Sequence, residues 1–170
     1  MTRRALLGVV GVATSCGYQV RGKTDLLPQS VKTIAIPTFG NATTRLKVSD
    51  RLAGAVTREF ITRTRYNVVA DPTHADAVLQ GTVLNLLAYP TVVDQVSQRA
   101  AGVQIAVVLH ITLTEAATGK VLFTRPNMEI RERYEISIDQ RQYFEESETA
   151  LQRLSGDVAR SVVSAVLSGF

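Results

Sequence analysis

The hydrophobic positions of this chain follow two periods, and each period predicts one kind of element. Across residues 102–114, large aliphatic side chains stand at every second position, which is typical of a strand with one buried face. The turn residues at 115–120 and the apolar run that begins at Val121 predict an antiparallel partner strand. Pro126-Asn127 interrupts this partner, and the apolar positions change parity after it. We therefore expect a bulge or bend at that point.

Two segments show the period of an amphipathic helix instead. Residues 43–64 carry one apolar stripe, and residues 141–167 carry a longer one. The first stripe consists of Val48, Leu52, Ala55, Val56 and Phe60, and the second of Phe144, Leu151, Leu154, Val158, Val162 and Val166. Arg153, Asp157 and Arg160 fall on the opposite side of the second helix. The sequence therefore predicts two helices that each bury one side.

Three further runs predict strands at residues 31–37, 66–69 and 75–88. The resulting order is strand, helix, four strands, helix. This order predicts an α+β two-layer sandwich, with both helices on one face of a mixed, mostly antiparallel sheet of four to five strands. The other sheet face is left to solvent or to a partner.

The first 15 residues have the layout of an export signal. Arg3 and Arg4 precede an uncharged apolar run at residues 5–13, and small residues follow. The apolar run is about half of the roughly 20 residues that a spanning helix needs. We therefore expect a lipoprotein signal peptide at 1–15, an acylated N-terminus and tether at 16–29, and one periplasmic domain at 30–170.

Cys16 is the only cysteine of the chain, so an intramolecular disulfide is impossible. The residues Ala13-Thr14-Ser15-Cys16 resemble a bacterial lipobox. In such motifs the sulfur receives a diacylglyceryl group, and the new amino terminus is acylated. We expect Cys16 to be modified in this way and to anchor the protein in a membrane. The alternative is a helical N-terminus with an inert thiol.

Composition excludes several classes of function. Hydrophobic residues make up 45% and charged residues 20% of the chain, which is ordinary for a globular protein. The formal net charge is +4, but the basic residues are scattered and the chain has no Trp. Nucleic-acid binding needs a concentrated basic surface and usually aromatic platforms, so no nucleic-acid partner is expected.

Candidate catalytic residues are few. Asp71, His74 and Asp76 could form the metal cluster of a periplasmic hydrolase, but their spacing matches no familiar ligand motif. A polar turn before a strand explains the same residues. No glycine-rich phosphate loop joins a strand to a helix. We therefore expect no enzyme activity, no metal and no cofactor.

Arginines on the second arm of the hairpin are candidates for phosphate binding. Arg131 and Arg133 stand two apart on a strand and therefore point to the same side. Glu129 and Glu135 share that side and could equally neutralise them. Lys120, Arg125 and Arg99 are weaker candidates of the same kind.

Several short segments, in this order, resemble the LptE family, the lipopolysaccharide-assembly lipoproteins of the Gram-negative outer membrane. The segments are Cys16 with the following residues GYQVRG, the spacing from Leu26 to Pro28, the strand IAIPTF at 34–39 followed by Asn41 and a helix, ADAVLQG at 75–81, and Thr118-Gly119-Lys120. The similarity runs over essentially the whole mature chain.

The resemblance implies a non-enzymatic protein on the periplasmic side of the outer membrane. Family members sit largely within the lumen of the β-barrel LptD, act as its plug and assembly partner, bind lipopolysaccharide, and help to deliver it. Lipid A phosphates would favour contacts with arginine, because the planar guanidinium pairs bidentately with phosphate. The rival interpretation is a lipoprotein accessory subunit of a secretion or transport complex, which would bind protein rather than lipid.

Overall fold

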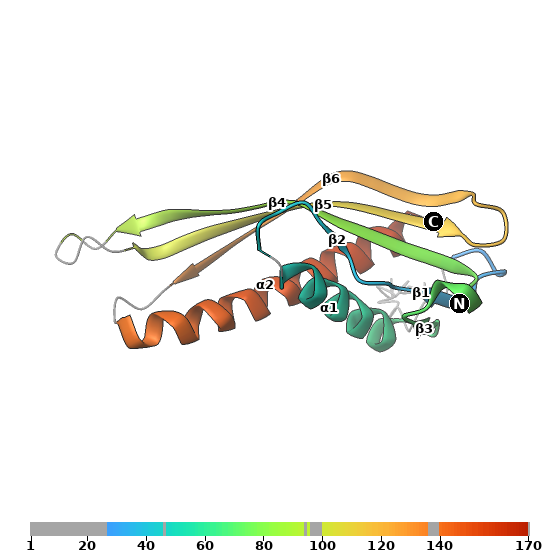
Figure 1. Cartoon of the computed structure of the whole chain (residues 1–170), viewed down its shortest axis with the longest axis horizontal. Helices are drawn as coiled ribbons and strands as arrows, with labels where there is room; N and C mark the ends of the chain where they lie inside the picture. Colours follow the sequence, from blue (N-terminus) through green and yellow to red (C-terminus); the bar gives the residue numbers. More distant parts are fainter. Residues whose placement is uncertain (1–26, 46, 94, 96–99, 136–139, 170) are drawn as a thin grey trace, which may run out of the picture.

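The protein forms two layers, a sheet and a pair of helices (Figure 1). The computed structural model describes residues 27–45, 47–93, 95, 100–135 and 140–169. Helix α1 (Val48–Arg63) and helix α2 (Gln140–Ser168) pack against each other beneath one face of the sheet. Buried side chains of both helices, among them Leu52, Phe60 and Val158, join those of the sheet in one core.

The sheet has six strands in the order β3-β1-β4-β5-β6, with β2 pairing to β4 beside that path. The strands are β1 (Thr33–Ala35), β2 (Gly40–Asn41), β3 (Asn67–Val69), β4 (Ala77–Val93), β5 (Ala100–Glu115) and β6 (Val121–Glu135). The pairs β1–β3, β1–β4 and β2–β4 are parallel, whereas β4–β5 and β5–β6 are antiparallel. The predicted α+β sandwich is confirmed, and β2 adds a short strand where the sequence indicated only a turn.

Strand β5 lies at the centre of the three long strands and shows the predicted alternation. Val107, Leu109, Ile111 and Leu113 are fully buried beneath the helices. Val103 and Ile105 continue the same alternation but are only half-buried. The strand therefore has a tightly covered half and a thinly covered half.

Gly81 provides room for the tightest packing in the covered half. A Cβ atom at this position would lie 2.7 Å from two ring carbons of Phe39, which is itself 3% exposed. The ring occupies the space that any larger residue at Gly81 would need. The sequence prediction of a strand rather than a helix around this glycine is confirmed, because Gly81 lies inside β4.

Strand β6 contains the predicted bulge. In the pairing with β5, Met128 lies opposite Leu109 and Arg125 lies opposite Ile111, so β6 has one residue more than its partner. Asn127 has a φ of 54°, the left-handed conformation that asparagine tolerates better than most residues. The extra residue moves Met128 and Ile130 to the helix-covered face.

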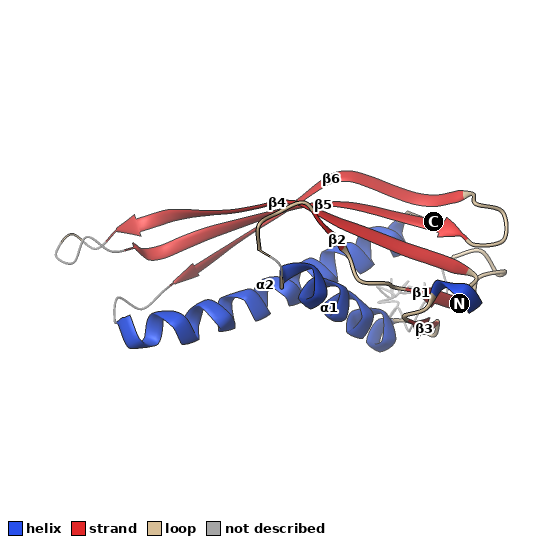
Figure 2. Ribbon diagram, viewed as in Figure 1, coloured by secondary structure: helices blue, strands red, loops and turns tan. Residues whose placement is uncertain are grey.

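Beyond the bulge, the long strands extend well past α1 (Figure 2). Strand β4 runs to Val93, five residues further than the sequence predicted. We call residues 84–93 of β4, with the β5 and β6 residues paired to them, the distal ribbon. The remainder of the sheet is called the proximal half.

Candidate functional site

The distal ribbon carries most of the exposed large apolar side chains of the described residues. Seven such side chains are at least one-third exposed, and five of them lie on β4 between residues 84 and 93. They are Leu84 (37%), Leu87 (37%), Tyr89 (49%), Val92 (44%) and Val93 (49%). Exposed apolar patches of this kind mark surfaces that bind a partner. The distal ribbon is therefore the first candidate binding surface.

One edge of the same ribbon is bare. Strands β1 and β2 pair with β4 only as far as Val83, and no described strand pairs with that side of β4 beyond it. Strand β4 contains no charged residue over its whole length. Exposed edge strands are usually protected by charged residues, since their free N–H and C=O groups can pair with another chain. Pro90 has no backbone N–H, so it is the one residue of this edge that cannot donate a backbone hydrogen bond.

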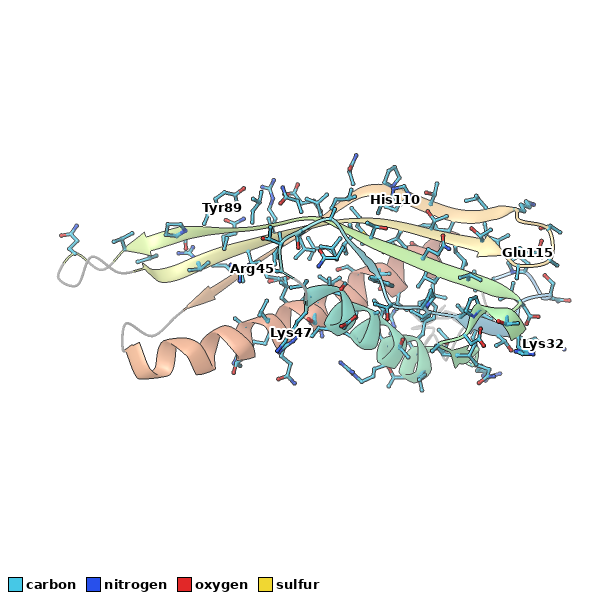
Figure 3. The ribbon with its side chains drawn as sticks, in the orientation of Figure 1. Lys32, Arg45, Lys47, Tyr89, His110 and Glu115 are labelled. Carbon is cyan, nitrogen blue, oxygen red and sulfur yellow. The ribbon has the colours of Figure 1, made fainter. Side chains whose placement is uncertain are left out.

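Neither described helix covers the sheet face that points away from α1 and α2. Figure 3 shows Tyr89 and His110 on this side of the sheet. His110 is exposed, and its Nε2 lies 3.0 Å from the Oγ1 of Thr112, which in turn lies 3.3 Å from the Oγ1 of Thr124. The open face thus has a row of neutral polar groups in its proximal half and apolar groups in its distal ribbon.

The four predicted phosphate contacts do not form one cluster. Lys120 lies in the turn between β5 and β6, Arg125 lies at the bulge, and both are exposed. Arg131 donates a hydrogen bond of 2.7 Å from its Nε to Oε1 of Glu129. This bond lowers the pKa of Glu129 and raises that of Arg131. The neutralisation by Glu129 that the sequence left open is therefore present. Arg99 lies outside the described residues.

Arg133 lies in a different environment from Arg131. It lines a hollow of about 650 Å³ between β6 and α2, together with Arg153 and Arg160 of the helix. A second hollow of about 340 Å³ lies on the other side of α2, between it and α1. The two hollows share Thr149 and Gln152. Arg133 is thus the predicted residue that the structure brings together with other cations.

Among the described residues, Asp71, His74 and Asp76 are not grouped to hold a metal ion. A carboxylate oxygen of Asp76 accepts hydrogen bonds from the backbone N–H groups of Lys32 (2.9 Å) and Thr33 (2.8 Å), and these bonds lower its pKa. Asp71 begins the 3₁₀ turn η1 (Pro72–His74) and accepts from both the N–H and the hydroxyl of Thr73, which lowers its pKa. Both carboxylates thus hold backbone in place.

Among the described residues, no group of three or more His, Cys, Asp and Glu side chains is arranged to hold a metal ion. Neither described helix has an apolar stretch long enough to cross a membrane. The predicted lipidation site, Cys16, lies outside the described residues.

Comparison with known protein families gives a decisive match. The model of the family described as "LptE: Lipopolysaccharide-assembly" matches residues 31–166. The chain belongs to the LptE family. Members of the LptE family are lipopolysaccharide-assembly proteins. The family is non-enzymatic. The match covers every strand and nearly all of α2, so it includes both candidate surfaces.

Solved structures share the fold of this LptE-family chain at low sequence identity. The rare lipoprotein B from Shewanella oneidensis has a TM-score of 0.53 and 12% identity, covering 80% of this chain and 94% of that one. The PelC dodecamer protein from Paraburkholderia phytofirmans has a TM-score of 0.55 and 13% identity, with coverages of 85% and 93%. An uncharacterized lipoprotein B from Nitrosomonas europaea has a TM-score of 0.53, 15% identity and coverages of 86% and 87%. At these identities the likeness concerns the fold alone. No curated protein matches the sequence.

Sequence reasoning missed the exposure of the distal ribbon. The sequence predicts a strand at 75–88 without indicating which of its side chains are exposed, and the structure exposes most of those in its second half. The available signal was the absence of charge from Ala77 to Val93, which is unusual for a strand with a free edge. Arg153 and Arg160 were placed correctly, away from the core, but their proximity to Arg133 depends on how β6 packs against α2.

Proposed function

We propose that this protein is a lipid-anchored lipoprotein on the periplasmic side of the outer membrane that plugs and supports the β-barrel LptD. In this role it takes part in lipopolysaccharide assembly without catalysing a reaction. Family membership supplies the assembly role, and the barrel partner is our inference from the family and from the exposed distal ribbon.

The distal ribbon is the observation that carries the proposal. Leu87, Tyr89 and Val92 expose apolar surface on an uncharged strand, and burying it against a partner would be worth about 25 cal/mol per Å². The bare edge of β4 adds free backbone groups that a partner can satisfy. Both features fit a partner that offers a large protein wall better than they fit a small soluble ligand.

The proposed anchor is compatible with the position where the described chain begins. The backbone N–H of Leu27 donates a hydrogen bond of 3.0 Å to the hydroxyl of Tyr66, so the chain enters the sandwich at its proximal end. Eleven residues from Cys16 to Leu27 reach at most about 40 Å when fully extended. We propose that the diacylglyceryl and N-acyl groups on Cys16 hold this end near the membrane.

The basic side chains of the sheet belong to the same proposal. Lys120 and Arg125 are exposed, and we propose them, with Arg131 and Arg133, as contacts for lipopolysaccharide phosphates. Replacing both Lys120 and Arg125 by Gln should weaken lipopolysaccharide retention on the purified protein. An unchanged amount of bound lipopolysaccharide would remove these two residues from the proposal.

Affinity purification of the full-length lipoprotein from native membranes tests the barrel partner. We expect LptD to be recovered with the unmodified protein and to be lost with Val92→Asp and Tyr89→Asp. Ile61→Asp and Val121→Asp are matched controls, because these side chains are 52% and 53% exposed but lie outside the distal ribbon. The controls should retain LptD.

Two outcomes would contradict the proposal. Recovery of an inner-membrane transporter instead of the barrel would favour the accessory subunit of a transport complex. Normal surface lipopolysaccharide after depletion of the protein would exclude a role in its assembly.

A further inference from the structure

The proximal end of the sandwich has a hollow beside the point where the described chain begins. Its volume is about 590 Å³, and it lies between the first described residues and the connection from α1 to β3. Leu27, Val31 and Tyr66 line it with buried side chains, whereas Lys32 is exposed at its rim. Figure 3 shows Lys32 at the end of the molecule opposite to Tyr89 of the distal ribbon. We call this space the proximal hollow.

The first described residues are fixed to distant parts of the chain. The N–H of Leu27 donates a hydrogen bond of 3.0 Å to the hydroxyl of Tyr66. The hydroxyl of Ser30 donates one of 3.3 Å to Oε1 of Glu115, and Asp76 holds the start of β1. Residues that precede Leu27 therefore leave from a fixed point on the wall of the proximal hollow.

Strand β3 borders the proximal hollow and has a free outer edge. Among the strands that the structure describes, β1 is the one that pairs with it. The N–H of Asn67 donates to the carbonyl of Lys32 at 2.9 Å. The carbonyl of Val69 accepts from the N–H of Ile36 at 2.9 Å. Backbone groups of successive residues point to alternate sides of a strand, so the N–H and C=O of Val68 point to the outer edge.

The chain itself supplies a segment for this edge. Residues 17–26 precede Leu27 and lie outside the described part of the chain. Leu27 is held at Tyr66, directly before β3, so the residues that precede it can run along β3 in the antiparallel direction. Three of the ten residues are enough to match the length of β3.

The short length of this edge favours a segment of the same chain over a foreign one. A segment attached at the proximal hollow has a high effective concentration there, and little entropy is lost in closing so short a loop. A separate chain that paired with three residues would gain too few hydrogen bonds to offset the cost of association.

Charge also favours this occupant. Lys32 and Arg65 are the two charged residues of the lining, and both are cations. Asp76 lies beside Lys32, whereas no ion pair between described residues involves Arg65. Asp25 is the only acidic residue of 17–26. It stands two positions before Leu27, so its carboxylate can reach the rim of the proximal hollow.

We propose that residues 24–26 pair with β3 as an additional antiparallel strand and cover the proximal hollow. The pairing does not depend on the barrel partner or on lipopolysaccharide. Its consequence for the anchor rests on the proposed lipidation of Cys16. The anchored segment then leaves the domain beside β3 instead of turning freely about Leu27, and the eight residues from Cys16 to Thr24 reach at most about 30 Å.

Hydrogen exchange of single backbone amides tests the pairing in the full-length lipoprotein, held in dodecyl maltoside micelles. The Val68 amide should exchange slowly, because the docked segment accepts its hydrogen. The Asn67 amide is the internal reference, since its bond to Lys32 reports whether β3 itself is formed.

Thr24→Pro with Asp25→Pro should undo the pairing, because proline has no N–H and its ring crowds a neighbouring strand. We expect the Val68 amide to exchange at least about tenfold faster, the scale of one lost hydrogen bond, with the Asn67 amide unchanged. Gln19→Pro with Val20→Pro is the matched control, because these residues lie before the three positions that pair with β3. The control should exchange as the unmodified protein does.

Three results would overturn the proposal. Fast exchange at Val68 with slow exchange at Asn67 in the unmodified protein would show that the outer edge of β3 is uncovered. Equal protection of Val68 in the two double-proline variants would mean that residues 24–26 do not cover it. Protection that falls when the protein is diluted would assign the edge to a second copy of the chain. Recovery of LptD is measured separately, so the proposed function and this pairing can fail independently.

Discussion

The proximal half of the sheet and the distal ribbon are built from the same kinds of residue, yet β4 buries its large apolar side chains in the first and exposes most of them in the second. In the proximal half, Leu79 and Leu109 are completely buried under the helices. In the distal ribbon, Leu87 and Val92 are 37% and 44% exposed. The cause is the sheet face on which each side chain stands. Leu79 and Leu109 face the helices, whereas Leu87 faces the open side, because the register of β4 shifts between Val83 and Asn85.

The comparison shows that stability and binding reside in different parts of one sheet. The proximal half contains the buried side chains that contribute free energy of folding. The exposed β4 side chains of the distal ribbon contribute little to folding and leave their apolar surface available. Substitutions in the two halves should therefore separate stability from partner binding, and the following predictions use that separation.

The largest effect is expected for Leu109→Ala. Removing this fully buried side chain should reduce the free energy of unfolding by about 2–5 kcal/mol, because it leaves a cavity in the core. Leu87→Ala in the distal ribbon is the matched control and should cost less than about 1 kcal/mol. Urea unfolding of the full chain measures both. Equal losses would show that the ribbon is part of the folding core.

The next largest effect is expected for Gly81→Ala. The new methyl group would lie 2.7 Å from the ring of Phe39, so the ring or the strand must move. Overpacking of this kind costs about 1–3 kcal/mol. Gly54→Ala is the control, because its methyl group meets nothing closer than 3.5 Å and alanine favours a helix. Thermal unfolding should show Gly81→Ala below, and Gly54→Ala at or above, the unmodified protein.

A smaller effect is expected for Asp76→Ala. The side chain joins the start of β4 to the backbone of Lys32 and Thr33, and losing these bonds should cost about 1–2 kcal/mol at neutral pH. Asp76→Asn keeps an oxygen acceptor and should lose less. Hydrogen exchange at the Lys32 and Thr33 amides provides a local measurement. Unchanged protection of these amides would contradict the role of Asp76.

The same carboxylate makes the proximal half sensitive to acid. The pKa of Asp76 in the folded protein is lowered from its ordinary value of 3.8 by the two backbone hydrogen bonds. Its contribution is therefore fully present above about pH 4 and is lost as the pH falls through the lowered value. Between pH 5 and pH 3, the difference in stability between the unmodified protein and Asp76→Asn should shrink. A constant difference would contradict this.

The smallest effect is expected for Arg131→Gln. Both members of the pair with Glu129 are well exposed, with side-chain exposures of 62% and 40%, and exposed ion pairs contribute little to stability. The unfolding midpoint should not change measurably at physiological salt. A clear loss of stability would mean that the distal part of β6 is more firmly held than its exposure indicates.

Much of the fold could be predicted from the sequence, because alternation and helical stripes report which side of an element is buried. The β5 alternation, the α1 stripe and the bulge at Pro126-Asn127 all have the predicted positions. Strand β2 could not be predicted, since Gly40–Asn41 has the composition of a turn and pairs only because β4 runs beside it. Local pattern does not contain that information.

The candidate sites were less predictable for the same reason. Arg133 was identified from its position on a strand, but its neighbours Arg153 and Arg160 come from a helix that is distant in sequence. Leu87 and Tyr89 are exposed because the register shift between Val83 and Asn85 places them on the open face, and alternation in the sequence does not report that shift. The one signal in the sequence was compositional: β4 contains no charged residue.

The bulge at Asn127 also limits how the sheet can grow. Strand β6 is one outer strand of the sheet, and its free side is interrupted by Pro126, which has no N–H, and by the extra residue beside it. The other free side of the long strands, on β4 beyond Val83, is uncharged, but Pro90 and register shifts beside Asn85 and Val92 interrupt it as well. Endless filaments need two receptive edges on each molecule. Because both free sides of the long strands carry a proline and an irregular register, neither is a regular template for endless strand pairing, which is compatible with a discrete complex.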